Sequence, residues 1–408
     1  MTRAFDLAGI TNTVGTPPEA FSVQVIQQID ALFEQAGLQR NLRGKRGVPT
    51  DRSSSVGCKH GVPTDRSSSV GCKRGVPTDR SSSVGCKSAG VTTRMRFERS
   101  TQQELTTPEP LPHIAPNGVQ WLAVPAWKKL NWLWHGFSTR RGGLSRAYCA
   151  GDAQGDLNLG FTDEDDQDTV ARNRRLFVEA VSGDPSTPLA DLRQIHSNLV
   201  LLAHVADASR KKPCKADGLM TDEPGLLLGI RTADCIPILV ADRKRRAVAA
   251  FHAGWRGTVE RIVESGIGRM RLQFGSRPED LVAAIGPGIG PCCYAVGEEV
   301  FSSFESQFAY ARELFREVYD SDPVRAKYPL LFMTQRAPGH SEIGPSLHLN
   351  LVEANRRQLL SAGLKPRSIH LVGGCTSCQP ELYFSHRASA GHAGRMMSVI
   401  GIRPDAAR

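Results

Sequence analysis

The chain lacks an apolar run long enough to cross a membrane. A spanning helix needs about 20 consecutive apolar residues, and the apolar stretches here, such as GLLLGI and AVAAF, are far shorter. The start of the chain, MTRAFDLAGITNTVG, also lacks the continuous hydrophobic segment of a secretory signal. We therefore expect a cytoplasmic protein without a membrane partner, whose ten cysteines are reduced thiols rather than disulfides.

Several compact binding motifs are also missing. The Gly-rich segment GPGIGP at residues 286–291 has neither the GxGxxG order nor the lysine of a phosphate-binding loop. The adjacent pair Cys292-Cys293 and the CxxC of Cys375 and Cys378 are not matched by a second CxxC. Because adjacent cysteines are a poor pair of ligands for one metal, we expect no four-cysteine zinc site. The CxxC also lacks the helix that a thioredoxin-type motif requires.

Most of the positive charge is confined to a repetitive segment. The sequence GVPTDRSSSVGCK starts at Gly47, Gly61 and Gly75, with a period of 14 residues. Residues 41–90 contain ten Lys or Arg and three Asp, which is a net +7 of the total +10. Each repeat has two valines and no aromatic residue, so it cannot bury enough apolar surface to offset chain entropy. We predict a disordered tail, and we do not expect it to bind nucleic acid.

The remaining sequence predicts one large α/β domain. Residues 1–110 form the predicted tail, with the repeats at 47–87 and one short amphipathic helix at residues 21–33. Residues 111–408 form the predicted catalytic domain, and we expect it to be a monomer. Short apolar runs predict buried strands in WLWHGFST, LVLLAHV, GLLLGI, IPILVAD, AVAAFH, SIHLVG and MMSVIGI, and helical spacing predicts helices at 168–181, 258–274 and 349–362. The RRGG segment after WLWHGFST is expected to be a turn.

Three residues of this domain are the strongest candidates for chemistry. His196 lies in LRQIHSN, Cys235 follows the apolar run GLLLGI, and His252 follows the apolar run AVAAF. Strand ends are where a fold presents reactive side chains to a cleft. Two imidazoles and one thiolate suit zinc at three of its four tetrahedral positions and leave the fourth for water or substrate. The separations match no compact metal motif, so buried packing residues remain an alternative at this stage.

An ordered series of motifs around these residues resembles a known family. The motifs are STRRGGLS, DLNLG, QIHS, ADGLMT, TADC, HAGWRG, IGPGIGPCCYAVG, LNLVEANRRQL and YFSHR…GHAGRMMSVIG, from about Trp132 to Ile402. They resemble the laccase-domain family, also called multicopper polyphenol oxidase-like proteins, whose members are described as purine nucleoside phosphorylases. One departure is Ala295, which stands where the family usually has an acidic residue after the tyrosine of its CCY motif.

The resemblance implies a fold, a site and a reaction. It implies a layered α/β/β/α sandwich with mixed sheets, a zinc ion on His196, Cys235 and His252, and a catalytic role for Cys235. Arg140 matches a residue at the same site, and its guanidinium would suit phosphate. The implied substrates are phosphate and adenosine, inosine or methylthioadenosine, which yield a free base and a ribose 1-phosphate. A deaminase activity on adenosine is also implied.

Two alternative enzymes remain open. Cys235 and a histidine would also suit a Cys-His hydrolase or amidase, which fits a link of the family to peptidoglycan editing. Copper is the second alternative, because copper binds two imidazoles and a thiolate more tightly than zinc does. The eleven histidines include no His-x-His pair of the kind that feeds the four-copper array of true multicopper oxidases. Zinc is therefore the expected ion, and a copper-dependent polyphenol oxidase is the alternative.

Overall fold

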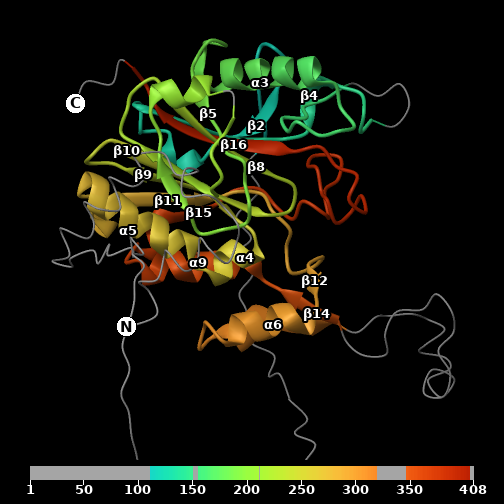
Figure 1. Cartoon of the computed structure of the whole chain (residues 1–408), viewed down its shortest axis with the longest axis vertical. Coiled ribbons are helices and arrows are strands. Elements are labelled where there is room, and N and C mark those ends of the chain that lie inside the picture. The colour runs from blue at the N-terminus through green and yellow to red at the C-terminus, as the bar shows by residue number, and fades with distance from the viewer. Residues whose placement is uncertain (1–110, 150–154, 211, 319–345, 405–408) are drawn as a thin grey trace, which may run out of the picture. The chain divides into compact units, whose positions relative to one another are not determined.

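Two stacked sheets and the helices that cover them make up the fold (Figure 1). The computed structural model describes residues 111–404 except 150–154, 211 and 319–345. All of these residues belong to one compact unit, which spans Thr92–Arg408. The predicted tail, its repeats and the predicted helix at residues 21–33 lie outside the described residues. In the part of the chain that is described, no helix is both long and apolar enough to cross a membrane.

The first sheet has six strands in the order β1-β2-β3-β16-β8-β5. Its strands are β1 His113–Ile114, β2 Gln120–Leu122, β3 Leu133–Ser138, β16 Met396–Ile402, β8 Leu227–Thr232 and β5 Leu189–Ala190. β16 runs antiparallel between β3 and β8, with Ile400 opposite both His135 and Leu228. Only β5 is parallel to its neighbour in this sheet. Among the described residues, the last strand is therefore a central strand of the sheet to which the first strands belong.

The second sheet has the order β15-β11-β9-β10-β7-β6. Its strands are β15 Ile369–Leu371, β11 Leu281–Ile285, β9 Ile236–Asp242, β10 Ala247–Ala253, β7 Gly218–Thr221 and β6 Val200–Leu202. β9 and β10 are buried along their whole length, which explains their nearly continuous apolar sequences. β15 and β11 run parallel, so the loops that follow them leave the sheet at the same edge.

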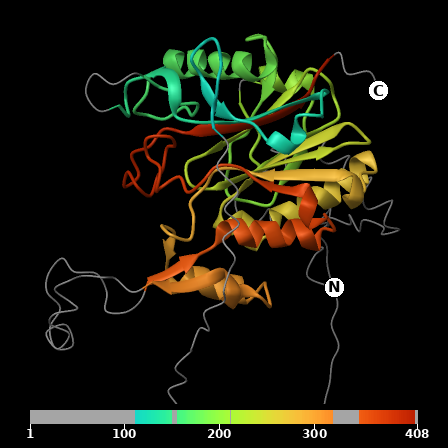
Figure 2. The same ribbon diagram turned by 180° about the vertical axis from the view of Figure 1, so that it is seen from behind.

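The helices cover the outer faces of the two main sheets or, in the case of one short helix, lie beside a third, small sheet. They are α3 Gln167–Ser182, α4 Trp255–Val259, α5 Ile262–Phe274, α6 Glu298–Glu305 and α9 Leu351–Ser361, with 3-10 turns η2 Pro125–Trp127, η3 Val205–Ser209, η4 Pro278–Asp280, η5 Ala311–Leu314 and η6 Pro366–Ser368. Figure 2 shows α3 on one side of the sheets and α5 and α9 on the other. A third, small sheet has the order β12-β14-β13 (Ala295–Val296, Ser346–Leu349 and Phe315–Val318), and β4 Arg141–Ser145 lies beside α3.

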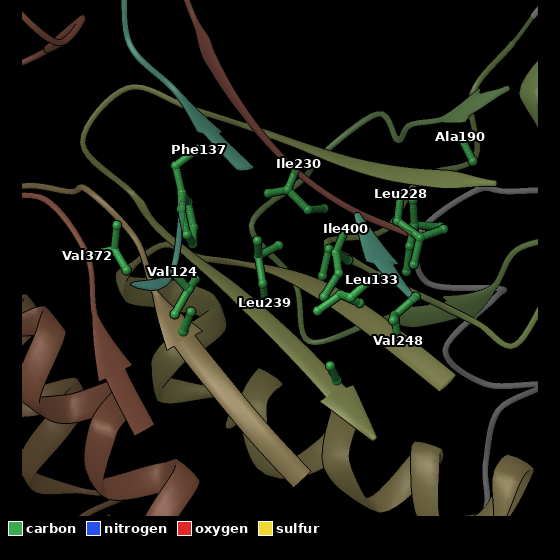
Figure 3. Packing of buried hydrophobic residues seen from close by; sticks show 14 of the residues in the cluster. Val124, Leu133, Phe137, Ala190, Leu228, Ile230, Leu239, Val248, Val372 and Ile400 are labelled. Carbon is green, nitrogen blue, oxygen red and sulfur yellow. The ribbon is translucent and has the colours of Figure 1, made fainter. Parts of the chain in front are cut away.

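A hydrophobic core fills the space between the two sheets (Figure 3). Leu228, Ile230 and Ile400 of the first sheet share this core with Leu239 and Val248 of the second. Separate apolar clusters join α3 to the first sheet and α5 with α9 to the second. The predicted α/β/β/α sandwich with mixed sheets is confirmed.

Some local predictions were wrong in detail. The predicted helix at 258–274 is two helices, because Arg261 between α4 and α5 has a left-handed φ of 62°. The RRGG segment is not a simple turn: Arg141–Ser145 form β4.

Candidate metal centre

His196, Cys235 and His252 come together from three segments of the fold. His196 is in the loop between β5 and β6, Cys235 is in the loop between β8 and β9, and His252 is near the end of β10. One ligand atom from each lies within 4.8 Å of the others. Cys235 Sγ is 3.8 Å from His196 Nε2, and the two imidazole rings have centroids 4.9 Å apart. The three side chains could therefore hold one metal ion.

The exposure of the three side chains differs in a way that suits an open site. His252 is buried, Cys235 is partly buried and His196 is exposed. The cluster is anchored on the inner strand β10 and reaches solvent at the His196 loop. A structural zinc normally has four protein ligands, whereas a catalytic zinc keeps one position open. The donor set and its exposed side fit the second arrangement.

The backbone around the cluster is unusual at two positions. His196 has a φ of 60° and Asp234, next to Cys235, has a φ of 89°, which is uncommon for residues other than glycine. Gly254 leaves room for both partners, because a Cβ there would lie 2.8 Å from His196 Cδ2 and 3.1 Å from Cys235 Sγ. The HAGWRG segment therefore supplies one candidate metal ligand, His252, and through Gly254 it leaves the space that His196 and Cys235 need to approach it.

Asp217 organises the cluster from behind. This fully buried carboxylate accepts the Nδ1 hydrogen of His252 at 2.8 Å and the backbone N–H of His196 at 2.9 Å. It also accepts both the backbone N–H of Ser197, at 2.6 Å, and its hydroxyl, at 2.8 Å. Because Nδ1 of His252 is directed at Asp217, its Nε2 is the atom left for the cluster. The sequence motif ADGLMT contains Asp217, but nothing in its spacing indicated this role.

The charges of these groups reinforce one another. Burial opposes the thiolate of Cys235, but His252 and His196 outweigh it and lower its pKa to about 6. Burial likewise opposes the imidazolium of His252, and Cys235 and Asp217 raise its pKa to about 9. Asp217 has a pKa lowered to about 2, because hydrogen bonds from His252 and Ser197 outweigh its burial. Cys235 is thus held as the thiolate, which is the form that binds metals and attacks electrophiles.

Asp234 joins the Cys235 loop to two other loops. Its carboxylate accepts the Thr376 hydroxyl at 2.6 Å and the Arg387 backbone N–H at 2.7 Å. Its carbonyl oxygen accepts the Ile289 N–H at 2.8 Å. Asp234 lies in a loop rather than on a strand, so its side chain is used to hold neighbouring loops in place.

Tyr294 lies close enough to the cluster to interact electrostatically with Cys235, and two arginines lie near Tyr294. Burial raises the pKa of Tyr294, the negative charges of Cys235 and Asp234 add to this, and Arg387 and Arg256 oppose it. The Arg387 guanidinium carbon lies 5.3 Å from the centre of the Tyr294 ring, and that of Arg256 lies 4.5 Å from the centre of the ring of its neighbour Trp255. Arg256 and Arg387 are exposed, so both guanidinium groups are accessible to an anion.

Arg140 is placed differently from the three donors. Its Nε and Nη2 donate to the carboxylate of Asp156, its Nη2 also donates to the Tyr148 carbonyl, and its Nη1 donates to the Pro380 carbonyl. Its guanidinium also stacks over Phe384, at 4.6 Å from the ring centre. These contacts occupy four of its five N–H groups. The phosphate contact expected for Arg140 stays a prediction. The observed contacts join Arg140 and Asp156 to the loop at residues 380–384.

The four cysteines for which we expected no shared zinc site nevertheless lie together in the fold. The Sγ atoms of Cys292, Cys293, Cys375 and Cys378 all lie within 4.8 Å of one another. The separation of the two pairs along the sequence hid their proximity, because the parallel pairing of β11 and β15 brings the two loops together.

A two-sheet sandwich with an exposed His-Cys-His cluster defines the class of protein. The chain belongs to the family described as multi-copper polyphenol oxidoreductase laccase, whose family model matches residues 134–403. A purine nucleoside phosphorylase of Deinococcus radiodurans is 36% identical over 288 residues, which is 71% of this chain and 91% of the relative. Another, of Bacteroides thetaiotaomicron, is 33% identical over 273 residues, covering 66% and 91%. The crystal structure of YlmD from Geobacillus stearothermophilus has a TM-score of 0.57 at 30% identity, covering 72% and 100%.

Proposed function

We propose that this chain is a zinc-dependent purine nucleoside phosphorylase. Its substrates would be phosphate and adenosine, inosine or methylthioadenosine, and its products a free purine and the corresponding ribose 1-phosphate. The observation that carries the proposal is the exposed cluster of His196, Cys235 and His252, in a chain that is 33% to 36% identical to proteins named purine nucleoside phosphorylase. We further propose deamination of adenosine as a side activity.

Zinc is the proposed ion on chemical grounds. Two imidazoles and a thiolate match zinc's preference for nitrogen and sulfur, and the Asp217–His252 contact matches the carboxylate–histidine pair that commonly supports a metal ligand. Phosphorolysis and deamination need no electron transfer, which favours zinc over copper in spite of copper's higher affinity. A zinc ion at this site would supply a Lewis acid and would lower the pKa of a water in its open position to about 7.

The remaining groups suit the two halves of phosphorolysis. An oxygen of phosphate forms a bond to C1′ of the ribose. The bond between C1′ and the purine nitrogen breaks, and its electron pair stays on the purine. Arg256 and Arg387 provide exposed positive charge for the phosphate, and Arg140 retains one N–H that would reach an anion. Tyr294 keeps its phenolic proton at neutral pH and would donate a hydrogen bond to the departing purine.

A phosphate-dependence assay on the purified full chain tests this proposal. Release of adenine from adenosine should require added phosphate, and ribose 1-phosphate should accumulate in equal amount. Cys235→Ala should abolish both, because it removes a metal ligand and the thiolate. Adenine release that is independent of phosphate would contradict phosphorolysis and would indicate hydrolysis instead. Inosine that appears from adenosine without phosphate would measure the deaminase side activity.

A Cys-His hydrolase is the second candidate, because one observation favours it. Cys235, His252 and Asp217 are linked in the order thiolate, imidazole and carboxylate, which is also the order of a nucleophile, a base and an orienting group. The two candidates differ in their need for metal. Amide cleavage that persists after complete removal of metal, without turnover of any nucleoside, would support the hydrolase and contradict the phosphorylase.

A further inference from the structure

A second cluster of metal-binding side chains lies outside the His-Cys-His site. Cys292 and Cys293 are in the loop after β11, and Cys375 and Cys378 are in the loop after β15. All four Sγ atoms lie within 4.8 Å of one another, with Cys378 Sγ 3.3 Å from Cys292 Sγ and 3.4 Å from Cys293 Sγ. All four are free thiols, since disulfide sulfurs lie only about 2.05 Å apart.

The spacing of these sulfurs suits a tetrahedral metal ion. Zinc binds sulfur at about 2.3 Å, so the four sulfurs of a regular tetrahedral site lie about 3.8 Å from one another. The observed separations of 3.3 Å to less than 4.8 Å lie around this value. Four thiolates complete the coordination of zinc and leave no open position, which is the arrangement of a structural rather than a catalytic site.

The backbone of the first loop is shaped around the sulfurs. The backbone N–H of Gly290 donates to Cys375 Sγ at 3.1 Å, a contact that is strongest when the sulfur is a thiolate. A Cβ at Gly290 would lie 3.1 Å from Cys375 Cβ and 3.2 Å from Cys292 Sγ. Glycine at this position therefore lets the chain pass close to the cluster and donate to it.

Neighbouring groups hold both loops in position. The Pro291 carbonyl, directly before Cys292, accepts hydrogen bonds from Arg316 Nη2 and from His348 Nδ1, both at 2.8 Å. The Pro380 carbonyl, two residues after Cys378, accepts Nη1 of Arg140 at 2.8 Å. Arginine side chains close to both loops also supply positive charge near what would be a negatively charged tetrathiolate zinc.

The same two loops support the Cys235 loop. Thr376, between the paired cysteines, donates to Asp234, and Ile289 donates to the Asp234 carbonyl. Thr376 also donates its N–H to the Gly288 carbonyl at 3.0 Å, which joins the two loops directly. We propose that Cys292, Cys293, Cys375 and Cys378 bind a structural zinc ion that fixes these two loops behind Asp234. This second site does not depend on the proposed enzymatic function.

Metal analysis of the full chain tests the proposal. Cys58, Cys72 and Cys86 are first changed to serine, so that the repeats cannot contribute ligands. Native mass spectrometry and elemental analysis should then find one zinc ion that is lost in both Cys292→Ser and Cys378→Ser, whatever metal occupies the His196 site. Cys235→Ala should retain this zinc, and the matched control Cys214→Ser should leave all metal in place. Zinc content unchanged by both Cys292→Ser and Cys378→Ser would overturn the proposal.

A second measurement does not depend on the folding of a variant. In the zinc-loaded chain, the four cysteines of the cluster should resist alkylation, while Cys149 and Cys214 react at the same rate with and without a chelator. Removal of zinc should make Cys292 and Cys378 reactive, because both are exposed. Rapid alkylation of all four in the zinc-loaded protein would contradict the proposal. Iron with labile sulfide, or a disulfide between these residues in the protein purified under reducing conditions, would also overturn it.

Discussion

The carboxylate of Asp217 lies 2.8 Å from Nδ1 of His252, and both groups are buried. The same carboxylate accepts the backbone N–H of His196. One acid therefore orients two candidate metal ligands: the side chain of His252 on β10 and the loop that carries His196. The backbone carbonyl of Asp217 also accepts the N–H of His252 at 2.7 Å. Asp217 thus couples the position of the exposed ligand loop to the inner sheet.

Replacement of Asp217 should weaken metal binding more than it destabilises the rest of the fold. Asp217→Asn keeps the shape of the side chain but removes the charge that favours the Nδ1 hydrogen of His252, so zinc affinity should fall about 10-fold to 100-fold. Competition with a chromogenic chelator measures this. Asp222→Asn, an exposed neighbour on the same segment, is the control and should bind zinc as wild type does. Equal affinities in all three proteins would refute the positioning role.

Each of the three candidate ligands should be required for the metal at the first site. His196→Ala, Cys235→Ala and His252→Ala each leave two protein ligands, and two ligands rarely retain zinc against a chelator. Elemental analysis after dialysis should show the loss of about one ion per chain in every variant. His204→Ala, in the 3-10 region beyond β6, is the matched histidine control. Full retention of that ion in all three variants would show that they do not share a metal.

Arg140→Ala should reduce stability more than its surface location suggests. It leaves Asp156, whose side chain is only 3% exposed, without its cationic partner, at a cost of about 3 kcal/mol. Thermal unfolding should show the loss, whereas Arg141→Ala next to it should unfold close to wild type. The KM for phosphate separates this structural effect from a phosphate contact. A raised KM with unchanged unfolding would assign Arg140 to phosphate alone.

Tyr294→Phe should lower turnover while substrate binding is largely kept. The variant retains the ring under Arg387 and removes the phenolic proton proposed for the departing purine. A general-acid contribution predicts a fall in kcat of about 100-fold, with a smaller effect on the KM for phosphate. Steady-state kinetics with adenosine measures both. A second test uses a nucleoside whose base departs without being protonated. With this substrate, Tyr294→Phe should have the same kcat as wild type.

Removal of residues 1–110 should leave catalysis intact. All residues of the first candidate site and the four-cysteine cluster lie beyond this segment, and the repeats contain too little apolar sequence to form a core. A chain that begins at Leu111 should match the full chain in kcat, KM and metal content. A soluble truncated chain that binds metal but has lost activity would show that the first 110 residues contribute to function.

Apolar runs and donor types predicted much of the fold and of the first site. β8, β9, β10 and β16 are short apolar runs that are buried on both faces, so their sequences carry a clear signal. His252 is at the end of such a strand, and Cys235 follows another within three residues. Residues of the right chemical type at strand ends are visible without a structure.

Features that depend on tertiary contacts were not predictable in this way. Asp217 acts through backbone N–H groups about 20 residues away, which leave no sequence pattern. The four cysteines meet because β11 pairs with β15, a pairing that no local signal encodes. The break between α4 and α5 was missed because Arg261 adopts a left-handed conformation without a glycine or proline to mark it.

The central place of β16 has a consequence for how the chain is made. β3 begins at Leu133 and is separated in sequence by about 260 residues from its partner, which ends at Ile402. During synthesis, β3 and β8 emerge from the ribosome long before the strand that must lie between them. The first sheet therefore cannot be completed until β16 has been synthesised, and until then β3 and β8 each expose an unpaired edge that is prone to pair with other strands.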